Sequence, residues 1–447
     1  MYLAGKTIKH IFMVLIYMPA ISNRAKYIFK IFFEDLIGLE FSLTASIDEF
    51  NVYTGPKINY SDNILGDEIN IKSNRLLFET DIIDQKTTLS EFENVPVFFG
   101  NRDPQASLPF DPFAAGFYMV SRYEEFLQFK GDQYGRFRSL DSIAFLGKFI
   151  RIPVVNLWAN MVRDLLTRRY RELRPKERKF RFVPTIDIDH AYAFGHRKLM
   201  RIIGGFSRDI SNGNFTSFML RAKVMLGREK DPYDNYDLIS KINEKYGVKP
   251  LYFVLFADYG RNDNNVSLNN KEFRALIKRL DQENEVGIHP SLTSNRNFSI
   301  LEKELYRLSD LLDRDVIRSR QHFLKISFPR TYRNLLRLGI TNDYSMGYAT
   351  DPGFRAGIAD PFNFFDLIDN TETELKIHPV TIMDVTLRDY YGFNRQKSQD
   401  YISKMIDTVR SVKGEFVSLW HNESFSDIGR WKGWQSIYEE MLKNVTG

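Results

Sequence analysis

The sequence predicts an α/β protein with a distorted (β/α)7-type barrel in its C-terminal part, preceded by an α+β domain. In the second half of the 447 residues, apolar runs that end in polar residues alternate with helix-like segments. The first part instead carries short apolar runs between Gly, Pro, Asn and Asp clusters. A basic stretch at 163–181, interrupted by Pro175, separates these two sequence patterns. We therefore expect an accessory domain of unknown function at 1–175 and a barrel domain at 182–447.

The barrel is expected because about seven strand–helix units follow one another, which is typical of a parallel sheet related to the eightfold α/β barrel. The stretch 339–365 is irregular. The expected strands are 181–189, 251–258, 285–289, 317–322, 339–344, 375–384 and 416–421, and the expected helices are 233–246, 271–281, 299–313, 332–338, 398–413 and 431–443.

In the first part, the apolar run 11–18 is expected to form a buried strand that leads into a helix at 21–39. Lys6, Lys9 and His10 precede this run, so an uncleaved anchor or a weak signal peptide is the alternative, although the run is too short to span a bilayer. Small strands are expected at 50–52, 76–78 and 95–99. At 108–126 a Pro-bounded turn opens a helix whose aromatic residues Phe113, Phe117 and Tyr118 should pack in the core.

Composition excludes several classes of function. The chain carries 62 Lys and Arg against 57 Asp and Glu, a net charge of +5 that is too mild to predict nucleic-acid binding. Zero Cys excludes disulfides, thiolate zinc sites, iron–sulfur clusters and cysteine nucleophiles. Any metal must therefore use His, carboxylate and water. We expect no transmembrane span and a cytoplasmic location, with a membrane-associated or periplasmic location as the alternative.

Ionisable residues fall at or just after the expected strand ends, and the carboxyl ends of parallel strands meet on the face that carries active sites. We therefore expect five separate segments to contribute to one site. The residues are Asp187 and Asp189, His289, Arg320 and His322, Asp343, and His421.

Each fragment has a chemical and a structural interpretation. Asp187 and Asp189 lie at i and i+2, so in an extended chain they point to the same side, as a metal ligand beside a general base would; they could also cap the next helix. Arg320 could hold a carboxylate ionised or form a plain buried ion pair. His289 could be a ligand or a structural residue. His421 could be a proton donor or a capping residue.

The order of these fragments along residues 182–447 resembles the polysaccharide deacetylases, the NodB-like superfamily of carbohydrate esterase family 4. Asp-x-Asp lies on the first strand, Gly-Ile-His-Pro-Ser on the third, an Arg motif on the fourth and Leu-x-His on the last. The segment 343–357 resembles a divergent bacterial branch of that superfamily, in which an uncharacterised N-terminal domain precedes the barrel.

The resemblance implies a divalent metal, usually zinc, held by one Asp and two His, with a second Asp as base. Asp189 matches the ligand and Asp187 the base, although the inserted Ile188 leaves room for the two roles to be exchanged. His289 matches the first His, but Thr293 stands where the second is usual. His322, His190 or a water molecule could take the place of the second His as a metal ligand. We prefer His322, because its strand should adjoin that of His289.

The implied activity is hydrolysis of a C–N amide bond that removes an acetyl group from an N-acetylated sugar, polysaccharide or glycan precursor. Arg320 would orient Asp187, and His421 would protonate the leaving amine. Tyr192, Tyr348 and Trp420 could line a sugar groove, and Arg355 could contact a substrate anion or form a loop salt bridge. The alternatives are a degenerate, non-catalytic protein that binds a glycan or partner, and a small-molecule amidohydrolase.

Overall fold

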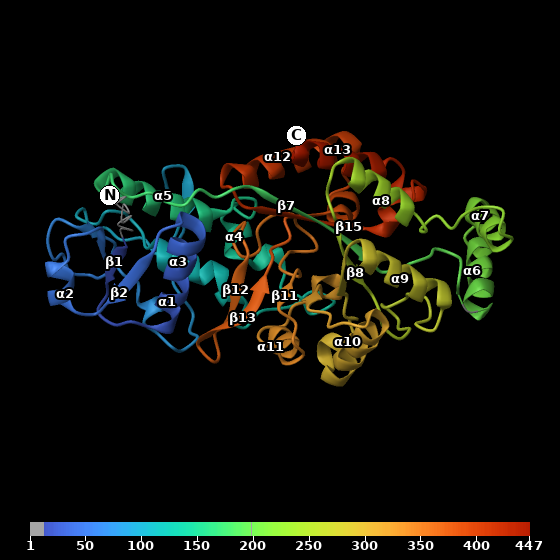
Figure 1. The fold of residues 1–447 in the computed structure, drawn as a ribbon, viewed down its shortest axis with the longest axis horizontal. Coiled ribbons are helices and arrows are strands. Elements are labelled where there is room, and N and C mark those ends of the chain that lie inside the picture. Colours follow the sequence, from blue (N-terminus) through green and yellow to red (C-terminus); the bar gives the residue numbers. More distant parts are fainter. Residues whose placement is uncertain (1–12, 198) are drawn as a thin grey trace, which may run out of the picture.

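The structure, a computed structural model, describes residues 13–197 and 199–447. Its N-terminal part contains a four-stranded parallel sheet in the order β2-β1-β3-β4, drawn in blue in Figure 1. Its strands are β1 (Val14–Tyr17), β2 (Phe41–Thr44), β3 (Lys57–Asn59) and β4 (Ile69–Asn70). The expected α+β arrangement of the first domain is not confirmed, because all the pairings in this sheet are parallel.

The N-terminal strand and helix follow the sequence pattern. Central strand β1 is buried at every residue, and α1 (Asn23–Lys30) begins where Ser22 accepts a hydrogen bond from the N–H of Ala25. A π-helical turn, Ile31–Ile37, continues the helix until Gly38 adopts a left-handed conformation. The targeting alternative concerns Lys6, Lys9 and His10, which lie outside the described residues.

Two of the three small strands predicted in this part are wrong. Residues 50–52 belong to helix α2 (Ile47–Val52), whose first turn is capped by Ser46, and residues 76–78 lie at a 3₁₀ turn capped by Asn74. Such side-chain caps favour a helical turn over an extended one in these short apolar runs. The third prediction is confirmed, since 95–99 contains β6 (Val95–Val97), which pairs with β5 (Ser90–Phe92).

Helix α3 (Pro112–Val120) begins where the sequence predicted. Asp111 accepts hydrogen bonds from the N–H groups of Phe113 and Ala114, and proline occupies the first helical position. Phe113, Phe117 and Tyr118 are buried, as expected. Two further helices complete the N-terminal part: α4 (Ile143–Leu146) and α5 (Val154–Arg169).

The C-terminal part is built on a nine-stranded sheet in the order β12-β13-β11-β10-β9-β8-β7-β15-β14, parallel throughout except for the β12–β13 pair. Each of the seven predicted runs contains a strand; β12, in the irregular stretch, was not predicted. The strands are β7 (Arg181–Ile188), β8 (Leu251–Val254), β9 (Glu285–Ile288), β10 (Arg318–Ser319), β11 (Asn342–Asp343), β12 (Phe362–Asp366), β13 (Thr371–Ile377), β14 (Ile382–Met383) and β15 (Glu415–His421).

The strand pairings of this sheet do not show closure into a barrel. Within the described ranges no strand ladder joins the edge strands β12 and β14. The chain between β13 and β14 makes single backbone hydrogen bonds instead, from Val380 N to Met346 O (2.9 Å) and from Thr381 N to Val417 O (3.0 Å). The sheet is thus a distorted parallel one, as the alternating pattern indicated, without continuous pairing around it.

Helices follow most of the parallel strands, and all six predicted helical segments are helices (Figure 1). Helices α6 and α7, which were not predicted, lie in Figure 1 at the end of the molecule opposite the N-terminal sheet. No helix among the described residues is long and apolar enough to cross a bilayer. The helices are α6 (Leu199–Ser211), α7 (Phe215–Met225), α8 (Tyr236–Lys245), α9 (Lys271–Glu283), α10 (Phe298–Leu312), α11 (Arg330–Arg337), α12 (Arg395–Ser411) and α13 (Trp434–Thr446).

A buried ion-pair network connects the two parts. Glu125 accepts from Arg355 (Nε–Oε1 2.9 Å, Nη2–Oε2 2.5 Å) and from Arg122 (Nε–Oε1 2.8 Å), and all three side chains are at most 2% exposed. Burial alone would raise the pKa of Glu125, but the two guanidinium groups hold it below its usual value. One hydrophobic core also includes residues from both parts. We propose that 1–175 and 182–447 are two units that fold against each other.

Replacing Arg355 by Met should destabilise the protein by about 3–5 kcal/mol, because Glu125 would then remain buried with one of its two cations missing. Urea denaturation of the full chain measures this difference. Arg138→Met is the matched control: Arg138 pairs with Asp141 at the surface, where such pairs contribute about 0–1 kcal/mol. Equal losses in the two variants would contradict a structural role for the buried network.

Candidate functional site

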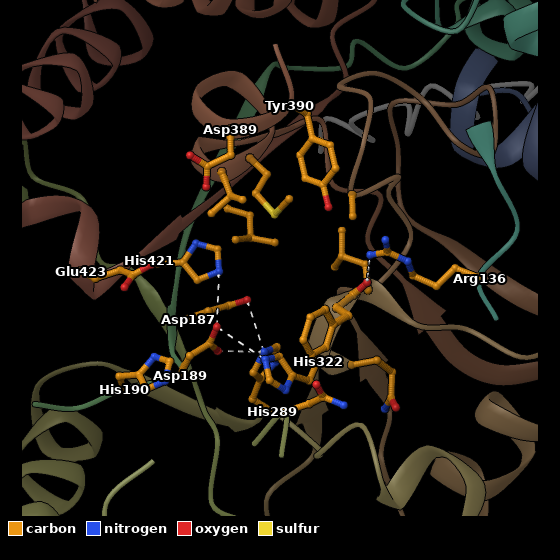
Figure 2. A pocket seen from close by; sticks show the side chains of 18 of the residues that line it. Arg136, Asp187, Asp189, His190, His289, His322, Asp389, Tyr390, His421 and Glu423 are labelled. Atoms are coloured by element: carbon orange, nitrogen blue, oxygen red, sulfur yellow. Dashed lines mark hydrogen bonds and ion pairs between the residues drawn. The ribbon is translucent and has the colours of Figure 1, made fainter. Parts of the chain in front are cut away.

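A pocket of about 280 Å³ opens where the carboxyl ends of β7, β9, β10 and β15 meet (Figure 2). It contains the acids and imidazoles that the sequence placed there: Asp187, Asp189, His289, His322 and His421. Its apolar wall consists of Phe323, Leu324, Ala349, Met383, Val385 and Leu419. The predicted convergence of distant strand ends is therefore confirmed for these five residues.

Strand geometry explains how the side chains reach the pocket. Asp187 is the seventh residue of β7 and pairs in register with His421 of β15 and Phe253 of β8. Asp189 follows two residues later, on the same side of the extended chain. His289 directly follows β9, where its N–H donates to Val254 O (2.9 Å).

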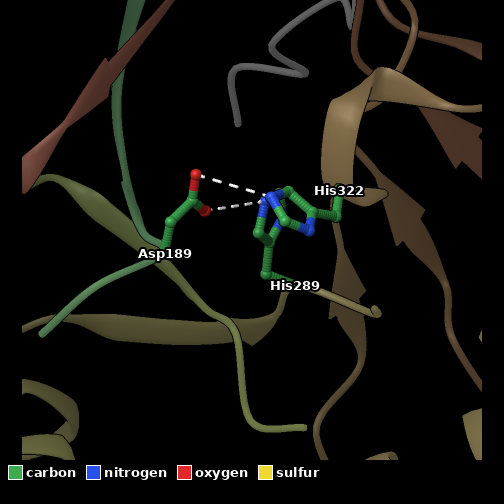
Figure 3. A group of neighbouring side chains, drawn as sticks. All are labelled: Asp189, His289 and His322. Atoms are coloured by element: carbon green, nitrogen blue, oxygen red, sulfur yellow. Dashed lines mark ion pairs between the residues drawn. The ribbon is translucent and has the colours of Figure 1, made fainter. Parts of the chain in front are cut away.

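Three side chains form a candidate cation site. One ligand atom each from Asp189, His289 and His322 lie within 4.8 Å of one another (Figure 3). His289 Nε2 lies 3.2 Å from Asp189 Oδ1, and His322 Nε2 lies 3.6 Å from Asp189 Oδ2. His322, which follows β10, is thus the third side chain of this cluster, and Thr293 is not part of it.

The contacts behind these ligands support a cation between them. His289 Nδ1 lies 2.6 Å from Arg320 O, and His322 Nδ1 lies 2.8 Å from Asp263 Oδ1. Both partners are acceptors, so each Nδ1 carries a proton and Nε2 is the nitrogen that faces the centre, where it could bind a cation in place of its own proton. Asp189 Oδ1 is buried and accepts no hydrogen bond from a described residue. Three protein ligands with an open position are the arrangement of a catalytic zinc site, so this donor set fits zinc.

The charges of the three groups are strongly coupled. Burial raises the pKa of Asp189, but the neighbouring His322 and His289 outweigh this effect and hold it well below its usual value. Burial lowers the pKa of His322, yet Asp189 and Asp263 raise it to about 9. The ionised carboxylate of Asp189 is therefore stabilised by positive charge placed close to it.

Asp187 is held by Arg320, as predicted. Arg320 Nη1 donates to Asp187 Oδ1 (2.8 Å) and to Thr185 Oγ1 (2.6 Å), while its Nε donates to Tyr344 O (2.9 Å). Its guanidinium lies over the ring of Phe253 and is fully buried. The second oxygen of Asp187 lies 3.8 Å from His289 Nε2. Asp187 is thus a fixed carboxylate beside the candidate cation site.

His421 has a carboxylate partner of its own. Its Nδ1 lies 2.8 Å from Asp384 Oδ1, and its backbone N–H donates to Asp384 Oδ2 (2.8 Å). Burial disfavours the imidazolium, but the charge of Asp384 outweighs this effect and raises the pKa of His421 to about 10. Its Nε2 faces the pocket, 3.8 Å from Asp189 Oδ2. His421 can therefore act as a proton donor on this side of the pocket.

The four predicted substrate-binding residues do not line this pocket, although Tyr348 and Arg355 line an adjoining hollow. Trp420 is fully buried against Phe425, Trp434 and Tyr438, and Tyr192 is buried beside His196, so neither presents a face to a sugar. These aromatic residues were expected to line a sugar groove, but alternate residues of a strand point away from the pocket.

Tyr348 and Arg355 belong to the ion-pair network between the two parts. Tyr348 Oη accepts from Arg122, and Arg355 binds Glu125. Arg355 therefore forms the salt bridge that was the alternative to a substrate contact. Asp343, also expected at the site, is fully buried and accepts from Ser319 and Ser345.

Sequence reasoning missed the acids that orient the imidazoles. Asp384 ends a predicted strand run, and this position was its only signal. Asp263 lies in the loop 255–270, between β8 and α9, where nothing in the pattern distinguishes it from neighbouring polar residues. Arg136 was missed because it comes from the N-terminal part.

Comparison with known proteins adds the following findings. Residues 14–171 match the model of a family of unknown function, DUF7033. No curated protein matches the chain.

Solved structures of three proteins share part of the arrangement. One is named as a polysaccharide deacetylase from Mycobacterium smegmatis (TM-score 0.41, 13% identity, 61% of this chain and 86% of that chain). Another, from Pseudomonas aeruginosa PAO1, carries the same enzyme name (0.38, 10%, 60% and 84%). The third is an allantoinase (0.37, 11%, 60% and 85%). With TM-scores below 0.5, these similarities carry no conclusion about this chain.

Zinc binding should depend on the three clustered side chains. We expect Asp189→Asn, His289→Ala and His322→Ala each to weaken Zn²⁺ binding severely, and Asp263→Asn to weaken it about 10–100-fold through loss of the contact that orients His322. Equilibrium dialysis of the full chain against Zn²⁺ measures the affinity. The control is His190→Ala, which removes a pocket imidazole outside the cluster and should retain binding.

Proposed function

We propose that this protein is a metal-dependent hydrolase that removes an acetyl group from the amide nitrogen of an N-acetylated sugar or glycan precursor. The observation that carries the proposal is a single pocket that contains three elements. These are the candidate cation site, the Asp187 carboxylate bound by Arg320, and the His421 imidazole bound by Asp384. Each element corresponds to one requirement of amide hydrolysis, which needs an activated water, a polarised carbonyl and a protonated leaving nitrogen. The resemblance of residues 182–447 to polysaccharide deacetylases supports the same reaction.

Asp189, His289 and His322 would hold the divalent metal, for which zinc is the best candidate given two imidazoles and one carboxylate. When bound, zinc polarises the amide carbonyl and lowers the pKa of a water molecule towards neutrality.

Asp187 would act as the general base. Arg320 donates to one of its oxygens, so the other oxygen would be free to accept a proton from the attacking water. The water oxygen then bonds to the carbonyl carbon. Because Arg320 is fixed by Thr185 and Tyr344 as well, it positions Asp187 without touching the substrate.

His421 would donate its Nε2 proton to the amide nitrogen as the C–N bond breaks. Asp384 orients the ring and favours the imidazolium, so the proton is available in the resting enzyme. The products are acetate and a free amine on the sugar. The apolar wall beside these groups suits an acetyl methyl group, and Phe323 and Tyr390 are aromatic residues of the pocket that could pack on a sugar face (Figure 2).

The proposal is tested by metal analysis and by acetate release from N-acetylated mono- and oligosaccharides. We expect stoichiometric zinc, turnover that stops with a chelator, and recovery when zinc is restored. Zinc binding without turnover of any sugar, but with turnover of cyclic or linear small-molecule amides, would instead favour an amidohydrolase. Metal-independent glycan binding that Asp187→Asn leaves unchanged would favour a non-catalytic binding protein.

Loss of the imidazole at 421 should separate chemistry from metal binding. In His421→Ala we expect kcat to fall about 10²–10⁴-fold, the usual contribution of a general acid, while zinc affinity stays within a few-fold of the parent. Steady-state acetate release and zinc dialysis on the same preparation measure the two effects. Asp384→Asn should lower kcat less, because the imidazole remains but is less well oriented.

A further inference from the structure

One residue from the N-terminal part reaches the pocket. Arg136 is the single pocket-lining residue, among those described, that precedes residue 175. Figure 2 shows its guanidinium turned toward the pocket interior, across from His421 and Glu423. The N-terminal part therefore contributes a charged group to the wall of the candidate active site.

The loop around Arg136 holds this guanidinium in place. Asp132 Oδ1 accepts from the N–H groups of Tyr134 and Arg136 (both 2.9 Å), and its Oδ2 accepts from Arg136 Nε (2.7 Å). Arg136 Nη1 donates to Phe323 O (2.9 Å), and its guanidinium lies 5.0 Å from the centroid of the Tyr134 ring. Phe323 has a left-handed backbone (φ 61°), a conformation that is uncommon outside glycine.

One nitrogen of this guanidinium has no partner. The side chain of Arg136 is 9% exposed, yet Nη2 donates no hydrogen bond to any described residue. Nη2 is not among the fully buried atoms that lack a partner, so it is open to the pocket, where a ligand or water can accept its hydrogen bonds. A preorganised donor with this remaining capacity is suited to an acceptor on a ligand.

The surroundings of the loop are positively charged. Lys325 Nζ donates to Tyr134 O (2.5 Å), and Arg296 Nη2 also approaches Gly135 of the loop. Neither Lys325 nor Arg296 forms an ion pair with another residue of the described ranges. Burial and the charge of Arg296 lower the pKa of Lys325, as expected where cations gather. The nearby acids are Asp132, in the same loop, and Asp351, which lines the adjoining hollow and accepts hydrogen bonds from Ser139 and Thr350. Arg136, Lys325 and Arg296 outnumber these two carboxylates, so the local field favours an anion.

There is also space for a charged group beside Arg136. A second hollow, of about 190 Å³, adjoins the pocket and shares Arg136, Leu324 and Ala349 with it. A ligand whose amide lies near His421 could extend toward Arg136 without displacing the chain.

We propose that Arg136 binds a carboxylate or phosphate group of the substrate, so that the preferred substrate is an acidic N-acylated sugar. The inference rests on the proposed function for the reaction, and it adds the class of substrate. It also gives the N-terminal part a role in substrate selection.

Calorimetric binding to the full chain tests this proposal without requiring turnover. The probes are N-acetylglucosamine, its 6-phosphate and N-acetylmuramic acid, which are neutral, phosphorylated and carboxylated. We expect at least one acidic sugar to bind about 10–100-fold more tightly than the neutral one, the range of a charge-assisted contact. The sugar that shows the gain identifies the anion.

Variants assign the gain to Arg136. Arg136→Gln should remove the difference in affinity between acidic and neutral sugars, and Arg136→Lys should retain part of it because the charge remains without the planar fork. The control is Arg75→Gln: Arg75 also lies in the N-terminal part, is exposed and paired with Glu79, and lines neither the pocket nor the adjoining hollow. Circular dichroism and unfolding curves verify that the variants fold.

The proposal is overturned if neither acidic sugar binds more tightly than the neutral one, or if no sugar binds. It is also overturned if the gain survives Arg136→Gln or is lost equally in Arg75→Gln. These outcomes are independent of the reaction: acetate release with no preference for acidic sugars would retain the hydrolase and reject this inference. Binding that depends on Arg136 without acetate release would do the reverse.

Discussion

Two carboxylates that lie on one side of a buried strand end repel each other, and the organisation of the pocket follows from how this repulsion is offset. Asp187 pairs with Arg320, which also donates from Nη1 to Thr185 Oγ1 and from Nε to Tyr344 O. Asp189 is left facing His289 and His322, which balance it only if they carry protons or share a cation with it. The two acids therefore receive different environments, which is the condition for two different roles.

The imidazoles are positioned in the same manner. Each of His289, His322 and His421 uses Nδ1 to contact an oxygen fixed by the fold, from Arg320, Asp263 and Asp384 respectively. Three Nε2 atoms consequently face one volume. The Nε2 atoms of His289 and His322 belong to the candidate cation site, and that of His421 lies across from them. The same kind of Nδ1 contact therefore orients the two candidate ligands and the candidate proton donor.

The N-terminal part is connected to this site through a hydrophobic core and ion pairs that it shares with the C-terminal part. The network of Glu125, Arg122 and Arg355 fixes the two parts against each other, and the loop carrying Arg136 reaches the pocket from the same side of the interface. A rigid interface is needed for this arrangement, because a binding group that moved with a loose domain would not select between substrates.

The sequence by itself determined the strand–helix alternation, all seven predicted strand runs and the five ionisable residues that meet in the pocket. These depend on local periodicity and on the rule that parallel strands end at one face. It also indicated His322 as the replacement for the position of Thr293, from the expected adjacency of two strands. The failures have a common physical reason. Whether Trp420 and Tyr192 face a ligand or the core, which acid orients His322 or His421, and whether Arg136 reaches the pocket all depend on contacts between residues remote in the chain. Only the tertiary structure decided these points, because side-chain direction and long-range packing leave no periodic trace in the sequence.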